Sequence, residues 1–177
     1  YSLDNIFICF GGNDYQNYTS TTLRALIPFL SHFKKVDVIC GLNNPNISQI
    51  EKIINKYSII KLHISPADFS SILSKSDFAI GACGVLNNER MFLGIPSLVF
   101  GISENQNKIA ENLIEEAYVL GNPKFYKPDI KVIQSWIDLI INNKFLLNNL
   151  SKKSKTLIDG EGIRRIYNAI NLQNYEF

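Results

Sequence analysis

The sequence predicts an α/β fold, a Rossmann-like doubly wound parallel sheet, and two features of the chain carry this prediction. Short runs rich in Val, Ile and Phe alternate along the chain with amphipathic stretches, which is the pattern of βαβ units. The short runs are apolar throughout, as expected for strands that are covered on both faces. Because parallel crossovers are right-handed, a doubly wound sheet is the expected arrangement.

The elements follow in a regular order. Residues 5–10 (NIFICF) form the first predicted strand, and Leu23, Leu26, Ile27 and Leu30 recur at helical spacing in a helix predicted over 18–31. Further strands are expected at 36–40, 59–64, 77–80, 97–100 and, weakly, 118–120. Further helices are expected around Ile50 to Ile54, at 66–75, from near Val85 to Leu93, at 104–116, and at about 129–143, 145–157 and 161–171.

Length and composition restrict the class of protein. The 177 residues fit one domain. The net charge of +2, from 18 basic and 16 acidic residues, argues against a nucleic-acid partner bound through a basic face. No apolar run approaches the roughly 18 residues of a membrane span. The chain starts at Tyr1, directly before the first strand, so we expect it to be cut from something longer.

Three cysteines indicate the compartment. Cys9, Cys40 and Cys83 each end an apolar run, their number is odd, and no pair has metal-type spacing. Buried thiols in a reducing compartment are the expected state, so the predicted location is cytoplasmic. The sequence suggests no metal site and no cofactor.

Three polar features follow predicted strands, at the edge where an open parallel sheet binds ligands. The first is Gly11-Gly12-Asn13-Asp14, whose paired glycines would let the backbone approach a ligand closely. The same residues also fit a tight turn into a helix capped by Asn17.

The second feature runs from Gly81 to Glu89. Two glycines make the turn after a strand, and the free amides at the start of the next helix suit an anion. Glu89, about one turn into the helix, suits a pair of bonds to two ribose hydroxyls. It equally fits a solvated helix residue paired with Arg90.

The third feature is Glu104-Asn105-Gln106, which opens a helix after the fifth strand. Amide side chains at this place would read sugar hydroxyls through paired donors and acceptors. The alternative is an ordinary polar first turn of a helix.

At these loops the sequence resembles a known family. The stretches FGGNDYQNYT (10–19), VDVICG (36–41), SDFAIGACGVLNNERMFLGIPSLVF (76–100), ENQ (104–106) and IDGEGIRRI (158–166) are similar to the C-terminal half of the UDP-2,4-diacetamido-2,4,6-trideoxy-beta-L-altropyranose hydrolases of pseudaminic acid biosynthesis. More distantly, they resemble MurG-like glycosyltransferases of the GT-B fold.

The resemblance implies that residues 1–177 are the single C-terminal, nucleotide-sugar-binding domain of a GT-B protein. The helical tail, about 129–177, would pack on this domain or cross to the missing N-terminal half. The expected partners are UDP or a UDP-sugar and that N-terminal domain. The implied contacts to UDP come from Gly12, Asn13, Gly84, Val85, Leu86 and Glu89, and those to the sugar from Asp14, Asn105 and Gln106.

The chain departs from the family's pattern at two positions and does not contain the family's catalytic histidine. Val85 stands where the family has a small hydroxyl residue, and Asn88 where an aromatic residue often precedes the glutamate. The histidine that activates water belongs to the N-terminal half, so the resemblance implies no catalytic residue in this chain.

A hydrolase that removes UDP from a diacetamido-trideoxy sugar is the first hypothesis. The donor half of a MurG-like glycosyltransferase and a non-catalytic GT-B-like domain are the alternatives.

Overall fold

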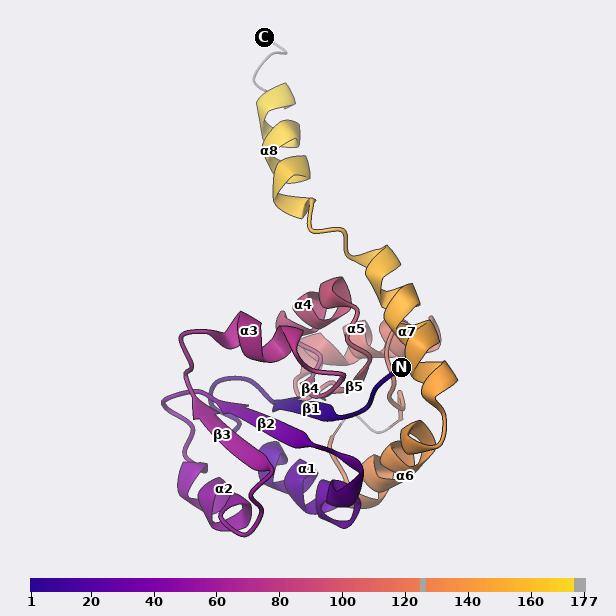
Figure 1. Ribbon diagram of the computed structural model, residues 1–177. Coiled ribbons are helices and arrows are strands. Elements are labelled where there is room, and N and C mark those ends of the chain that lie inside the picture. The colour runs from indigo at the N-terminus through magenta and orange to yellow at the C-terminus, as the bar shows by residue number, and fades with distance from the viewer. Residues whose placement is uncertain (125–126, 174–177) are drawn as a thin grey trace.

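Five parallel strands form one sheet at the centre of the protein. The computed structural model describes residues 1–124 and 127–173, and the strands lie in the order β3-β2-β1-β4-β5 (Figure 1). Their bounds are β1 (Asn5–Cys9), β2 (Lys35–Cys40), β3 (Ile60–Ile64), β4 (Phe78–Ala82) and β5 (Ser97–Phe100). The α/β fold class expected from the sequence is confirmed.

Strand β1 lies in the middle of the sheet because it is apolar on both faces. Ile8 pairs with Val38 of β2 on one side and with Ile80 of β4 on the other. All three side chains are fully buried, which is the environment that a continuous Val/Ile/Phe run predicts.

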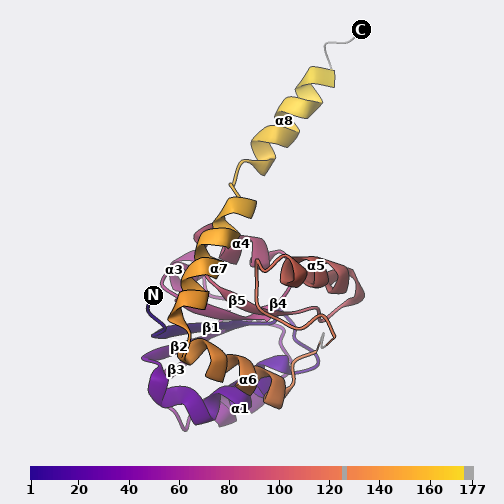
Figure 2. The ribbon, with the colours of Figure 1, turned by 90° about the vertical axis from the view of Figure 1, so that its right-hand side faces the viewer.

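Helices cover both faces of the sheet. Their bounds are α1 (Tyr18–Leu26), α2 (Ile47–Ile54), α3 (Phe69–Ser74), α4 (Leu86–Leu93), α5 (Glu104–Glu115), α6 (Ile130–Ile141), α7 (Lys144–Leu157) and α8 (Gly162–Gln173), with a 3₁₀ helix, η1, at Ile27–His32. Figures 1 and 2 place α1 and α6 on one side of the sheet and α3 and α4 on the other. On the first side, Ile6 and Ile8 pack in one cluster with Leu23 and Ile137, and on the second side Phe7 packs with Leu73.

Four predicted elements differ from the structure. The strand expected at 77–80 extends to Ala82 as β4, so Gly81 lies in the strand and only Gly84 lies in the turn. The helix expected over 18–31 ends as an α-helix at Leu26 and continues as η1, because Pro28 has no N–H to donate. The helix expected at 66–75 starts only at Phe69, where the Asp68 side chain accepts a hydrogen bond from the Ser71 amide. The weak strand expected at 118–120 is a single bridge between Leu98 and Leu120.

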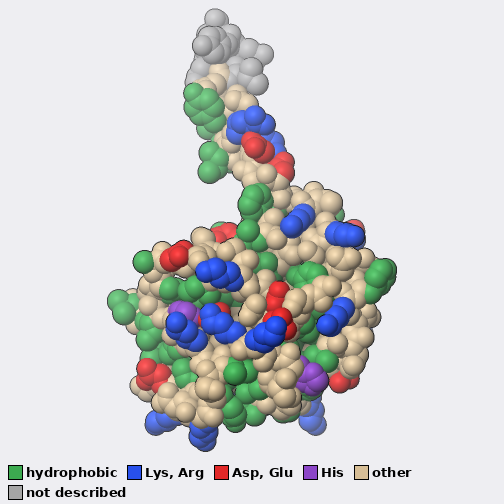
Figure 3. Space-filling view, viewed as in Figure 1, with side chains coloured by type: hydrophobic (Ala, Val, Ile, Leu, Met, Phe, Trp, Pro, Cys, Tyr) green, Lys and Arg blue, Asp and Glu red, His purple; other side chains and the backbone are tan. Residues whose placement is uncertain are grey.

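The helical tail divides into a packed part and a projecting part. Helix α6 buries Ile133, Ile137 and Ile140, and α7 buries Leu147 and Leu150. Helix α8 extends away from the body of the protein (Figures 1 and 2). Ile163, Ile166, Tyr167 and Ile170 are 57–84% exposed along it, and Figure 3 shows hydrophobic side chains along one side of this helix.

None of the helices in the described residues is both long enough and apolar enough to cross a membrane. On the face drawn in Figure 3, acidic and basic side chains are interspersed, in keeping with the small net charge.

Candidate functional site

The strand order places the candidate site between β1 and β4. The chain leaves β1 toward β2 and β3 on one side, and later returns to add β4 and β5 on the other. This is the topological switch point, where the loops after two neighbouring strands diverge and leave a crevice. Two glycine-containing loops follow these two strands: residues 11–14 come after β1, and residues 83–85 come after β4.

A cavity of about 270 Å³ lies at the start of α4. It is lined by the turn after β4, by the first turn of α4 and by the first turns of α5, through Cys83, Gly84, Val85, Asn87, Asn88, Asn105, Gln106 and Ile109. The second and third predicted loops therefore come together here. Gly84 and Gln106 are close enough that a Cβ on Gly84 would lie 3.4 Å from Gln106 Nε2.

The backbone at this cavity offers hydrogen-bond donors. Within residues 1–124 and 127–173, the amides of Gly84, Val85 and Leu86 donate to no backbone acceptor, and no side chain caps α4. The positive end of the helix dipole lies at the same place. Free amides together with this dipole end favour an anion.

The α5 side of the cavity presents two carboxamides. Asn105 Oδ1 accepts a hydrogen bond of 2.7 Å from the Ser103 hydroxyl, so its amino group is oriented by that contact. Gln106 Oε1 accepts a longer bond of 3.4 Å from the Ile102 amide. Both amino groups are available to acceptors such as sugar hydroxyls.

Glu89 lies on a neighbouring hollow. Its side chain is exposed and lines a mostly apolar hollow of about 520 Å³ between α3, α4 and the segment after α7, together with Phe92, Leu93 and Ile158. Asn88 lines both this hollow and the smaller cavity. Glu89, the residue expected to bind ribose, therefore lines a different hollow from the residues expected to bind phosphate and sugar. Asn88 is the residue that the two hollows share.

The residues of the first loop differ in exposure and in their contacts. Gly12 and Asn13 are exposed, and the Gly12 carbonyl accepts a hydrogen bond of 3.0 Å from the Gly41 amide. Asp14 is buried, and its two carboxylate oxygens accept bonds of 2.9 Å each from the Tyr18 and Thr19 amides. This carboxylate holds the start of α1, so a contact between Asp14 and a sugar is not what its geometry favours.

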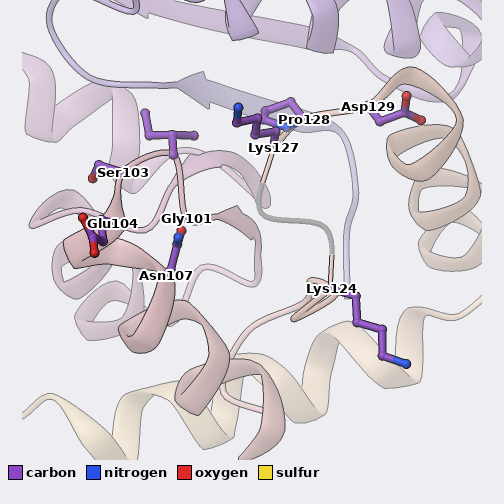
Figure 4. Close-up of a pocket in the computed structure, with 9 residues that line it drawn as sticks. Gly101, Ser103, Glu104, Asn107, Lys124, Lys127, Pro128 and Asp129 are labelled. Atoms are coloured by element: carbon purple, nitrogen blue, oxygen red, sulfur yellow. The ribbon is translucent and has the colours of Figure 1, made fainter.

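A larger hollow, of about 610 Å³, opens beyond β5 and was not expected from the sequence. Figure 4 shows Gly101, Ser103, Glu104 and Asn107 on one side of it and Lys127, Pro128 and Asp129 on another. Two lysines, Lys124 and Lys127, line this hollow. In the sequence, the feature that could have indicated this hollow is the pair Lys124 and Lys127, in the polar segment after the weak strand predicted at 118–120.

Arg90 occupies a different position from the expected one. It is fully buried, and its Nη2 donates a hydrogen bond of 2.5 Å to the Ala82 carbonyl. It therefore does not form the solvated pair with Glu89 that the sequence allowed. Loss of hydration lowers the pKa of this guanidinium to about 10, and it remains charged near neutral pH.

The sheet order and its flanking helices define a class, the Rossmann-like α/β domains, and solved structures share this fold. MnaA of S. aureus, solved with UDP, superposes with a TM-score of 0.74 over 98% of this chain and 47% of that chain, at 17% identity. MurG of Acinetobacter baumannii superposes with a TM-score of 0.67 over 95% of this chain and 52% of that chain, at 15% identity.

The chain belongs to the family described as protein of unknown function DUF354, whose model matches residues 15–171. It is also 25% identical over 166 residues to SpsG, a spore coat polysaccharide biosynthesis protein of Bacillus subtilis (strain 168). That match covers 92% of this chain and 48% of SpsG. The chain therefore spans about half the length of SpsG.

Proposed function

We propose that this chain is the nucleotide-sugar-binding half of a protein of polysaccharide biosynthesis, and that its ligand is UDP or a UDP-sugar. The observation that carries the proposal is the 270 Å³ cavity at the start of α4, where free amides face the carboxamides of α5. The name of SpsG and the UDP bound in the MnaA structure support it.

The diphosphate is assigned to the amides of Gly84, Val85 and Leu86. These donors sit at the start of a helix, so they offer hydrogen bonds and a partial positive charge to the same oxygens. Val85 lacks a hydroxyl, but backbone donors do not depend on the side chain. Gly12 and Asn13 approach from the loop after β1, across the switch point.

The nucleoside and the sugar are assigned to opposite sides of this phosphate site. Asn88 lines both hollows, so a bound nucleotide would run from the helix start toward Glu89, whose carboxylate accepts from two ribose hydroxyls. The sugar would lie toward Asn105 and Gln106. Asp14 is assigned no contact with the sugar, because its carboxylate accepts hydrogen bonds from the first amides of α1.

The reaction belongs to the whole protein. Because the chain spans about half of SpsG, we propose that a second half supplies the acceptor side and any general base. Helix α8, with its exposed apolar side chains, is the element proposed to cross to that half. The three cysteines are free and buried, which supports the proposal of a reducing, cytoplasmic location.

Two reactions fit this arrangement. A hydrolase of the pseudaminic acid type would use water as the acceptor, and a glycosyltransferase would use a sugar. The fold shared with MurG and the name of SpsG favour a transferase-type or other polysaccharide-biosynthesis reaction over hydrolysis in particular. A non-catalytic GT-B-like domain is the third hypothesis. Val85 and Asn88 favour it, because both depart from the family's pattern at this site.

Titration with UDP tests the binding proposal. In ¹H–¹⁵N NMR spectra, millimolar UDP is expected to shift the amide signals of residues 82–90 and of Asn105 and Gln106. Glu89→Ala is expected to weaken binding roughly tenfold or more, because it removes a charged hydrogen-bond acceptor. Glu51→Ala, at another exposed glutamate on α2, serves as the matched control and should bind as the wild type does. Unchanged signals in residues 82–90 at millimolar UDP would rule out the nucleotide assignment.

A further inference from the structure

Arg90 carries a charge that the described protein does not neutralise. Its side chain is fully buried, and one hydrogen bond to the Ala82 carbonyl is its polar contact. Its Nε and Nη1 atoms have no partner among the described residues. No acidic side chain forms an ion pair with it in residues 1–124 and 127–173, where the ion pairs lie elsewhere.

Asn87 repeats this situation one turn earlier on α4. It is 1% exposed and lines the 270 Å³ cavity. Both its Nδ2 and its Oδ1 lack a partner within the described residues. Residues three apart lie on the same side of a helix, so Asn87 and Arg90 together form a buried polar strip along the inner face of α4.

The strip lies directly beneath the turn that carries the free amides. Arg90 Nη1 lies 3.0 Å from the position that a Cβ on Gly81 would occupy, and the Cys9 carbonyl borders the same space. The guanidinium is therefore located between the ends of β1 and β4, under the switch point. Asn87 lines the cavity beside Cys83, Gly84 and Val85, whereas Arg90 is not among the residues that line it.

Unpartnered groups of this kind are costly to bury. An unbonded buried amide destabilises a fold by about 1–3 kcal/mol, and an unpaired buried charge destabilises it by more. Native proteins leave few such groups, and those that remain call for an explanation such as a ligand or ion. One anion in the adjoining cavity would satisfy the positive charge, the free backbone amides and the Asn87 Nδ2 group together.

We propose that Asn87 and Arg90 form a buried oxyanion-recognition layer of this site. Asn87 contacts a phosphate oxygen through Nδ2. Arg90 is a positioning residue, which fixes the Ala82 carbonyl and supplies positive charge from below without touching the ligand. The identification of the anion as the diphosphate of a nucleotide rests on the proposed function. The layer itself requires only an oxyanion, for which inorganic pyrophosphate is a sufficient probe.

The experiment compares variants in ligand-free stability and in affinity for pyrophosphate and UDP. Asn87→Leu keeps the number and branching of the side-chain heavy atoms and removes the unpartnered amide, so its ligand-free Tm is expected to rise while affinity for both probes falls about tenfold. Arg90→Met is expected to weaken both probes at least as much, and Arg90→Lys, which keeps the charge, should retain part of the binding. Arg24→Met removes the same charge from an exposed position on α1 and should bind both probes as the wild type does.

The outcomes separate this layer from the nucleotide assignment. A purely structural role predicts a lower Tm for Asn87→Leu and unchanged affinity of the folded protein, and that result overturns the proposal. Pyrophosphate binding that depends on Asn87 and Arg90, without UDP binding, supports the layer and rejects UDP as the ligand. UDP binding that neither variant weakens rejects the layer and leaves the proposed function standing. If the wild type binds neither probe, both are rejected. Should Arg90→Met fail to fold, Asn87→Leu and Arg90→Lys decide the matter.

Discussion

Gly81 lies where β1 and β4 approach each other at the switch point. A Cβ at this position would overlap the Cys9 carbonyl oxygen and would lie 3.0 Å from Arg90 Nη1. The obstacle on one side is backbone of the central strand, which cannot move without breaking the ladder on both its edges. Glycine is therefore required here for space, while its φ is unremarkable.

Gly81→Ala is expected to lower the free energy of unfolding by about 1–3 kcal/mol, the usual result of overpacking. Urea denaturation followed by circular dichroism measures the change. Gly12→Ala is the matched control, because no atom lies within 4 Å of the Cβ it would add, and its stability should remain near that of the wild type. Equal stability of the two variants would mean that the strands adjust, contrary to this account.

The last three helices have similar apolar patterns and different surroundings. Ile137 of α6 is fully buried against the sheet-side core, whereas Ile166 of α8 is 63% exposed. Helix α8 begins beside a local anchor, in which Asp159 pairs with Arg165 at 2.7 Å and accepts from the Glu161 amide. These interactions stabilise the first turn of α8, but they join residues of the same segment and do not hold α8 against the rest of the domain.

The same substitution in the two helices should therefore have unequal effects. Ile137→Ala is expected to destabilise the domain by about 2–5 kcal/mol, since it removes buried methyl groups and leaves a cavity. Ile166→Ala is expected to change stability by less than about 0.5 kcal/mol, as a surface substitution does. Thermal unfolding of both variants in parallel checks this. A large loss for Ile166→Ala would show that α8 packs on the domain in solution.

The three buried thiols affect the pH range over which the whole domain is stable. Burial raises the pKa of Cys40 to about 12 and also raises the pKa of Cys9 and Cys83. In the unfolded chain these thiols would ionise near pH 9. Above that pH the unfolded state loses protons that the folded state keeps, so unfolding becomes easier as the pH rises.

We expect the Tm to be nearly constant between pH 7 and pH 9 and to fall from pH 9 toward pH 12. Cys40→Ala should reduce the steepness of this fall, because it removes one of the ionising groups. Val38→Ala, at a buried position on the same strand, is the control: it should lower the Tm throughout and leave the steepness unchanged. Differential scanning fluorimetry across pH 7–11, with a reductant that is not a thiol, makes the comparison. Identical slopes for the wild type and Cys40→Ala would contradict it.

Much of the fold could be predicted because its signals are local. Continuous apolar runs give the five strands, and helical spacing gives the helices to within a few residues. Pro28 shows where the prediction over 18–31 went too far, since the pattern of leucines continues after the α-helix has ended. The single bridge at Leu120 was predicted only weakly because one pairing leaves almost no pattern in the chain.

Positions in the site were predictable where backbone chemistry decides them. The glycine turn followed by a helix start indicated Gly84 to Leu86, and the polar start of the next helix indicated Asn105 and Gln106. All of these but Leu86 line one cavity. Their assignment to UDP and sugar remains a prediction until ligand binding is measured.

The side chains of Asp14, Glu89 and Arg90 depended on the tertiary structure. Asp14 accepts hydrogen bonds from the first two amides of α1, Glu89 lines the hollow beside Phe92, and Arg90 is buried under the turn after β4. Nothing in the order Glu89-Arg90 says which of two adjacent charges faces solvent, because neighbours on a helix differ by about 100° in direction. Apolar runs and glycine turns act through the chain's own geometry, so they can be read in the sequence. The burial of a charge depends on strands that are distant in sequence, and only the assembled sheet brings these together over α4.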